Sequence, residues 1–302
     1  MAYFDMGKYA EAEPWLMKAR SAKKTVTASD YNLGRIAFET KRYEDAVQYF
    51  ERILAKDSYN VQALKAAAYT YIRTGDLDKA EAYYNRTLAL VPESADDGYN
   101  YALVLYAVKK YGDAEEILAK YTAALQENKD IQLLYARAQK MQRKPEAVDS
   151  YALWLAVNDD PLVRYEYGAC LEYTRVYALA LEEYRAAYTA LPADSKTPTK
   201  PEVRFAIARV MLIADSDNDE GITELEGAII DGFADFDAVT LLLTEDAISQ
   251  VRKTDIQRII DNPPQPASEQ PAVAKDTEAA VEQSEEPPVS ETDQPGAAKN
   301  GG

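Results

Sequence analysis

The sequence predicts an all-α fold built from stacked helix pairs, and two observations support this fold class. Apolar residues recur at helical spacing along most of the chain, and the helical stretches themselves recur with a fixed period. The pairs of residues that carry this period begin 34 residues apart: Tyr9-Ala10, Tyr43-Glu44, Leu77-Asp78 and Tyr111-Gly112. Since one helix pair cannot bury its apolar face alone, repeats of this length are expected to stack into a solenoid.

Small and large residues keep separate phases along the repeat. The small residues form two series: Ala12, Ala46, Ala80, Ala114, Ala147 and Ala180, and Gly34, Ala68, Ala102, Ala136, Gly168 and Ala206. The large residues form a third: Leu16, Phe50, Tyr84, Leu118, Tyr151 and Tyr184. We expect the small residues where two helices cross closely and the large ones in the space around each crossing.

Residues 61–94 show the clearest single unit. Val61 to Thr74 has helical apolar spacing, and Gly75-Asp76 interrupts it. Asp78 to Leu90 resumes the pattern, and Pro92 ends it. This order of signals predicts a helix, a short turn, a second helix and a stop.

This unit is similar to the tetratricopeptide repeat, with Ala68, Ala80, Tyr84 and Pro92 at the matching places. The resemblance implies a right-handed α-solenoid of stacked antiparallel helix pairs, of the bacterial type that ends in a capping segment. The units assigned on this register are 1–26 (partial), 27–60, 61–94, 95–128, 129–160 (shortened), 161–194 and 195–231 (degenerate), followed by a helical cap at 232–261. Large residues at Tyr121 and Trp154 predict disturbed stacking around residues 121–165.

The two ends of the chain differ from the repeats. Met1 falls inside the first helix of a unit, so Ala2 to Met6 would form its last turn and upstream residues would complete it. We therefore expect fraying at this end. Residues 262–302 hold seven of the 14 prolines, eight acids and two lysines, and no aromatic residue. This composition predicts a disordered acidic tail.

Composition excludes several classes of function. The chain of 302 residues has 51 acidic and 34 basic residues, for a net charge of −17. Such a surface repels nucleic acid and anionic membranes. The sequence contains no run of 18 apolar residues and therefore predicts no membrane-spanning helix. Cys170 is the single cysteine, which leaves the compartment open between cytoplasm and periplasm, because a signal or anchor could precede Met1.

The resemblance also implies a binding surface, since the family binds extended peptides or helices in the concave groove lined by first helices. The residues at the inward-facing places predict a partner-binding site: Asn32, Arg35, Lys65, Tyr69, Arg73, Asn100, Tyr106 and Arg137. Cations among aromatic residues in an acidic protein favour an acidic peptide as the partner. The alternative is that these residues only form the solvated side of the helices.

No motif in the sequence predicts catalysis, a cofactor or a metal centre. Histidine is absent, which removes the commonest general base and metal ligand. Residues 215–226 carry oxygen donors at calcium-loop spacing, but Glu220 occupies the place of the sharp-turn glycine. An acidic turn before a helix is the competing interpretation. Cys170 lies on the packed side of a helix, where a small buried residue is expected.

The sequence therefore predicts a non-enzymatic scaffold for protein–protein interaction, monomeric, with a protein or peptide partner. The alternative is a structural or self-associating module of a larger assembly. In either case the acidic tail, through Glu285-Glu286, could occupy the groove and exclude partners.

Overall fold

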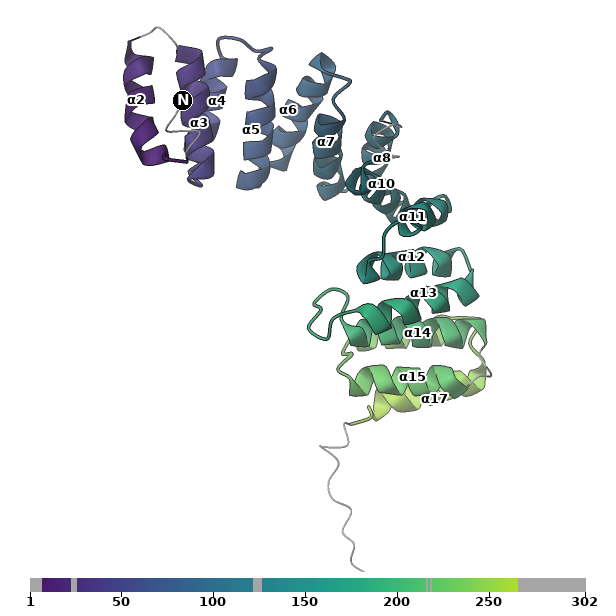
Figure 1. Ribbon diagram of the computed structural model, residues 1–302. Helices are drawn as coiled ribbons and strands as arrows, with labels where there is room; N and C mark the ends of the chain where they lie inside the picture. The colour runs from purple at the N-terminus through teal and green to yellow at the C-terminus, as the bar shows by residue number, and fades with distance from the viewer. Residues whose placement is uncertain (1–6, 23–25, 122–126, 216, 218, 266–302) are drawn as a thin grey trace, which may run out of the picture. The chain divides into compact units, whose positions relative to one another are not determined.

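The computed structural model describes residues 7–22, 26–121, 127–215, 217 and 219–265. Every regular element in these ranges is a helix, which confirms the predicted all-α solenoid (Figure 1). The helices are α2 (Tyr9–Ser21), α3 (Val26–Glu39), α4 (Tyr43–Leu54), α5 (Val61–Thr74), α6 (Leu77–Leu90), α7 (Ala95–Ala107), α8 (Tyr111–Ala119), α10 (Lys129–Met141), α11 (Ala147–Leu155), α12 (Pro161–Tyr173), α13 (Tyr177–Ala190), α14 (Lys200–Ala214), α15 (Asp219–Ile230), α16 (Phe236–Leu241), the 3₁₀ helix η1 (Leu242–Thr244) and α17 (Gln250–Asp261).

Two predictions lie outside the described residues. The first is the helical turn at Ala2 to Met6, together with its expected fraying. The second is the disordered tail, of which only residues 262–265 are described. All the helices belong to one compact unit that ends at Pro264.

The helices form antiparallel pairs that pack in chain order. Among the described helices, six pairs contain a first helix and a second helix: α3 with α4, α5 with α6, α7 with α8, α10 with α11, α12 with α13, and α14 with α15. Each pair also contacts the next along the chain. The two helices predicted in residues 61–94 are confirmed, with the second beginning at Leu77. The repeat boundaries themselves stay an assignment from the sequence.

The turn inside each of the first five pairs has one recurring backbone conformation. A residue with positive φ follows the end of the first helix by one or two positions: Lys41 (61°), Gly75 (81°), Lys109 (63°), Arg143 (55°) and Arg175 (64°). The amide after each of these residues donates to a carbonyl five residues back, as from Lys110 to Leu105 at 2.8 Å. This is a Schellman C-cap, which satisfies carbonyls at the helix end. Glycine has no Cβ and adopts this left-handed conformation without strain, whereas lysine and arginine are strained in it.

We expect the Lys109→Gly substitution to stabilise the protein. Lys109 holds a left-handed φ of 63°, and removal of its Cβ relieves strain that exceeds the added chain entropy of glycine. The expected gain is about 0.5–1 kcal/mol, measured as the free energy of unfolding in urea. The reciprocal substitution Gly75→Lys, at the same place in the preceding pair, should lose a similar amount. Equal stabilities for both variants would contradict this account.

Small residues let the two helices of a pair approach, as the repeat pattern predicts. Ala68 and Ala80 are fully buried. A Cβ on Gly34 would lie 2.6 Å from Cε1 of Phe50, and a Cβ on Gly168 would lie 2.7 Å from Cε1 of Tyr184. The Phe50 and Tyr184 rings therefore pack directly on the backbone of the first helix of their pair.

The buried core is divided at α10. One cluster of buried residues extends from Ala37 to Ala138, and a second extends from Ala136 to Met211. The second helices on either side, α8 and α11, are short, with nine residues each. After α8 the Tyr121 hydroxyl donates to the Pro92 carbonyl at 3.0 Å. These features fit the expected disturbance around residues 121–165, which stays a prediction.

The C-terminal cap closes the last pair with a third cluster of buried residues. Phe233 stacks on Phe205 of α14, with ring centroids 4.2 Å apart and an interplanar angle of 12°. Gly232 precedes it with a φ of 109°, a conformation that glycine permits. Ile256 and Ile259 of α17 complete the cluster. The cap thus covers the apolar surface that the last repeat would otherwise expose.

Candidate functional site

The first helices of the six pairs form the surface where the candidate site lies. We call the surface of α3, α5, α7, α10, α12 and α14 the first-helix face. The eight residues predicted for partner binding lie on its first four helices: Asn32 and Arg35 on α3, Lys65, Tyr69 and Arg73 on α5, Asn100 and Tyr106 on α7, and Arg137 on α10.

The structure gives several of these residues an internal partner. Lys65 forms an ion pair with the buried Asp97 of α7. Arg137 pairs through Nε with Glu166 of α12 at 2.9 Å. Asn32 is only 8% exposed, and its Nδ2 donates to the Ala28 carbonyl in the same helix at 2.8 Å. The positive charge expected on this half of the face is therefore partly neutralised by acids from the next first helix.

Arg137 belongs to a partly buried network. The Tyr151 hydroxyl donates to the same Glu166 oxygen at 3.0 Å. Burial raises the pKa of Tyr106, and the nearby Glu166 carboxylate raises it further. The hydrogen bonds of this network link α10, α11 and α12, and Tyr106 of α7 interacts with it electrostatically. It holds neighbouring repeats together and leaves Glu166 with two donors.

A small pocket between α3 and α5 contains two of the predicted residues. Its volume is about 210 Å³, and we call it the aromatic pocket, lined by Tyr31, Arg35, Phe38, Glu39, Phe50, Ala66, Tyr69 and Thr70. The rings of Phe38 and Tyr69 lie 5.3 Å apart, and Tyr69 is 45% exposed. Arg73, one turn further, donates to the Tyr43 hydroxyl at 3.1 Å and lies over its ring. The pocket is large enough for one side chain.

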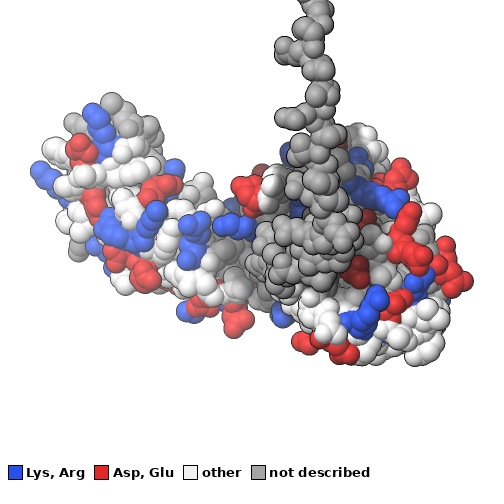
Figure 2. All heavy atoms as spheres, turned by 90° about the horizontal axis from the view of Figure 1, so that it is seen from below, with Lys and Arg blue, Asp and Glu red and all other residues white. Residues whose placement is uncertain are grey.

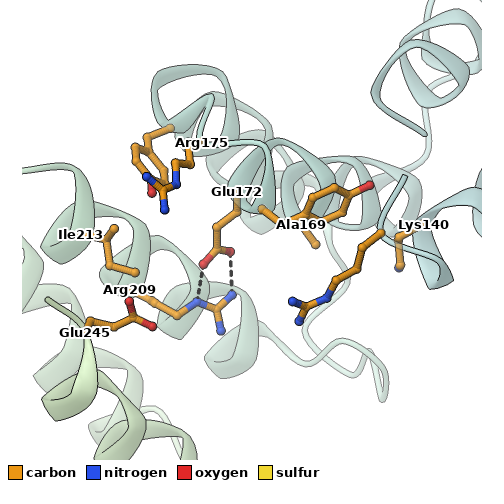
Figure 3. A pocket seen from close by; sticks show the side chains of 10 residues that line it. Lys140, Ala169, Glu172, Arg175, Arg209, Ile213 and Glu245 are labelled. Atoms are coloured by element: carbon orange, nitrogen blue, oxygen red, sulfur yellow. Dashed lines mark hydrogen bonds and ion pairs between the residues drawn. The ribbon is translucent and has the colours of Figure 1, made fainter. Parts of the chain in front are cut away.

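A larger pocket lies further along the same face, where the sequence analysis placed no site. Its volume is about 600 Å³, and we call it the cationic pocket, lined by Lys140, Arg143, Ala169, Glu172, Tyr173, Arg175, Tyr177, Arg209, Ile213 and Glu245 (Figure 3). The residues come from α10, α12 and α14, from the first residue of α13, from the turns after α10 and α12, and from the segment after η1. Four cations face two carboxylates, a formal excess of two positive charges in a protein of net charge −17.

One wall of the cationic pocket is a fixed ion pair. Arg209 donates through Nε and Nη2 to the two oxygens of Glu172, at 2.6 and 2.7 Å, and Figure 3 shows the two groups pointing toward each other. The Tyr184 hydroxyl donates to the same carboxylate at 3.0 Å. Burial raises the pKa of Tyr184, and the charge of Glu172 raises it further, so the phenol stays a donor. This pair is bidentate and positioned by packing.

The other cations of this pocket are available to a ligand. Arg143 and Arg175 are exposed, and Lys140 is half-buried. None of the three has an ion pair or side-chain hydrogen bond within the described ranges. Arg143 and Arg175 are the left-handed residues of two successive turns. The series at this position reads Lys41, Gly75, Lys109, Arg143 and Arg175. A change from lysine to arginine in that series was the sequence signal for this pocket.

Charges elsewhere on the protein are mixed. In Figure 2 acidic and basic side chains are interspersed over the visible face outside the grey atoms. Several pairs bridge adjacent repeats, such as Arg42 with Glu13 at 2.9 Å and Lys110 with Glu81 at 2.7 Å. Exposed pairs of this kind contribute little individually. They do remove these cations from the set that could bind an anionic partner.

Metal binding and cysteine chemistry gain no support where the structure can be described. No group of three potential ligands gathers in the described ranges. In the candidate calcium loop, residues 216 and 218 lie outside those ranges, and the Asp219 carboxylate pairs with Arg252 of α17. Cys170 is fully buried, and burial raises the pKa of its thiol to about 11. The thiol therefore stays protonated at neutral pH.

Comparisons with known proteins agree with the repeat pattern. Two tetratricopeptide repeat family models match residues 1–61 and residues 37–103. An uncharacterized lipoprotein of Treponema pallidum (strain Nichols) is 26% identical over 140 residues, which covers 46% of this chain and 71% of the lipoprotein. The protein O-mannosyl-transferase Tmtc3 of Drosophila melanogaster is 28% identical over 169 residues, 54% of this chain. The chain spans only 18% of the length of that transferase.

Solved structures show the same fold. A tetratricopeptide repeat protein from Parabacteroides merdae ATCC 43184 has a TM-score of 0.52 at 20% identity, covering 80% of this chain and 94% of that one. A MamA AMB-1 structure has a TM-score of 0.51 at 22% identity, covering 56% of this chain and 93% of MamA. Similarity at these identities concerns the fold alone.

Among the described helices, none has both the length and the apolar character needed to cross a membrane.

Proposed function

Because the chain is a tetratricopeptide repeat protein, we propose that it is a non-catalytic scaffold that holds a segment of a partner protein along the first-helix face. Proteins of this fold commonly serve as interaction modules, and the site decides what each one binds. The observation that carries the proposal is the placement of both pockets on this one face. The partner segment would lie across successive first helices and make contacts in both pockets.

The aromatic pocket would anchor one side chain of the partner. Tyr69 and Phe38 present ring surface, while Arg35 and Glu39 at the rim supply polar groups. A concave apolar site with a few polar groups at its edge is the usual form of a binding pocket. Aromatic residues are also the commonest energetic centres of protein interfaces. Two of the eight predicted residues, Arg35 and Tyr69, line this pocket, and all eight stay proposals for partner binding.

Site-specific photocrosslinking tests this function. A benzophenone amino acid replaces Tyr69 in the aromatic pocket, or Tyr59, which is 73% exposed and lines neither pocket. We expect a crosslinked partner from extract of the source cells with the probe at Tyr69 and none at Tyr59. The Phe38→Ala substitution should reduce the Tyr69 product at least fivefold. Equal crosslinking from both positions, or none from Tyr69, would argue against the first-helix face as the binding surface.

Exposed apolar residues favour a second candidate, self-association. Trp15 and Met17 on α2 are 64% and 46% exposed. On the proposed function the protein is a monomer, and its sedimentation coefficient is independent of concentration. A coefficient that rises with concentration and returns to the monomer value in a Trp15→Ser variant would favour self-association. The acidic tail stays a proposed competitor for the first-helix face, in which case deletion of residues 262–302 increases partner affinity.

A further inference from the structure

The cationic pocket differs from the rest of the first-helix face in the state of its cations. On α5 and α10, Lys65 and Arg137 are each paired with an acid of the next first helix. Lys140, Arg143 and Arg175 line the cationic pocket without such a partner in the described part of the chain. Because three such cations line a single pocket in a protein of net charge −17, we infer that an external anion completes this pocket.

The identity of the cations specifies the geometry of that anion. Arginine binds planar oxyanions through two parallel N–H groups, whereas lysine acts as a point charge. Arg143 and Arg175 stand at the left-handed turn position, where the earlier pairs have Lys41, Gly75 and Lys109. The arginines thus appear in the two turns that border the pocket. The pocket already contains one carboxylate bound in this mode, Glu172 on Arg209 at 2.6 and 2.7 Å.

We propose that the cationic pocket binds two neighbouring carboxylates of an acidic peptide segment, one on each unpaired arginine. The positive charge of Lys140 would attract both carboxylates. The volume of about 600 Å³ exceeds what a single small anion fills and suits two side chains. Tyr173, Tyr177 and Ile213 supply apolar surface for the methylene groups of glutamate. This inference rests on the proposed function and names the chemical class of its partner.

The electrostatics favour a short acidic segment over an extended polyanion. The pocket has a local excess of two positive charges, which two carboxylates balance. Glu245 at the pocket repels further anionic groups. The net charge of −17 repels a long polyanion beyond the pocket. The sequence predicted a cationic binding site between Asn32 and Arg137. This proposal instead places the site for an acidic segment in the pocket formed by α10, α12 and α14.

The test is fluorescence anisotropy with the full chain at low salt. The probe is a labelled glycine–serine peptide that contains two adjacent glutamates, and the matched peptide contains two glutamines. We expect saturable binding of the glutamate peptide only. The double substitution Arg143→Gln with Arg175→Gln should weaken it at least tenfold. The matched control is Lys109→Gln, which removes an exposed cation at the same turn position away from the pocket and should leave affinity unchanged.

Each outcome decides the proposal. Equal binding of both peptides, or equal loss in the Lys109→Gln control, would show non-specific attraction and overturn it. If inorganic phosphate displaces the labelled peptide at lower concentrations than the unlabelled glutamate peptide does, the pocket is a phosphate site and the proposal is overturned. Circular dichroism of the double variant, with unchanged helicity, shows that lost binding is not lost folding. If this test fails while the crosslink at Tyr69 succeeds, the scaffold function stands and only the partner's chemistry is wrong.

Discussion

The Tyr184→Ala substitution should lower the free energy of unfolding by about 4 kcal/mol. Its ring is fully buried, so truncation leaves a large cavity between α12 and α13, and such substitutions cost about 3–5 kcal/mol. Gly168 of α12 lies against the ring, so this backbone loses its packing partner. The substitution also removes one donor from Glu172. Urea unfolding followed by circular dichroism measures the effect.

Two controls separate the causes of this loss. Tyr184→Phe keeps the ring and removes only the hydroxyl that donates to Glu172, so about 1–2 kcal/mol should be lost. Tyr59→Ala removes a ring that is 73% exposed and should change stability by less than about 0.5 kcal/mol. If Tyr184→Ala costs no more than Tyr59→Ala, the ring does not hold the helix pair together.

The Phe233→Ala substitution should release the C-terminal cap. Phe233 stacks on Phe205 at 4.2 Å, and both rings are buried in the last core cluster. Loss of this contact costs about 3 kcal/mol. Because the cap meets the repeats only at one end, we expect the cap to open before the repeats unfold. Trypsin should then cleave after Arg252, Lys253 and Arg258 of α17 at least tenfold faster, as mass spectrometry of the fragments would show.

The matched control for the cap is Leu241→Ala. Leu241 belongs to α16 but is 63% exposed, so its truncation should leave the cleavage rate unchanged. Fast cleavage in this control would mean that the cap is already loose. Unchanged cleavage in Phe233→Ala would mean that Ile256 and Ile259 hold α17 in place without the aromatic stack.

The candidate site shows which of its features the residue positions within the repeat predict and which they do not. The register of the repeat correctly assigns all eight predicted residues to first helices, because position within a 34-residue unit determines the helix. It does not reveal that Asp97 neutralises Lys65 or that Glu166 neutralises Arg137, since both acids come from the following pair. The same limit hid the cationic pocket, whose lining residues are spread over more than 100 positions, from Lys140 to Glu245.

The sequence by itself determined the helix pairs of this protein, their order and their close crossings. Those features depend on local signals, such as the small residues at Gly34 and Ala68 and the stop at Pro92, which act within one repeat. The tertiary structure decided which charges remain free, because an ion pair between neighbouring first helices depends on how one repeat packs on the next. Among the residues that the structure describes, it left Arg143 and Arg175 without an ion pair where α10, α12 and α14 come together.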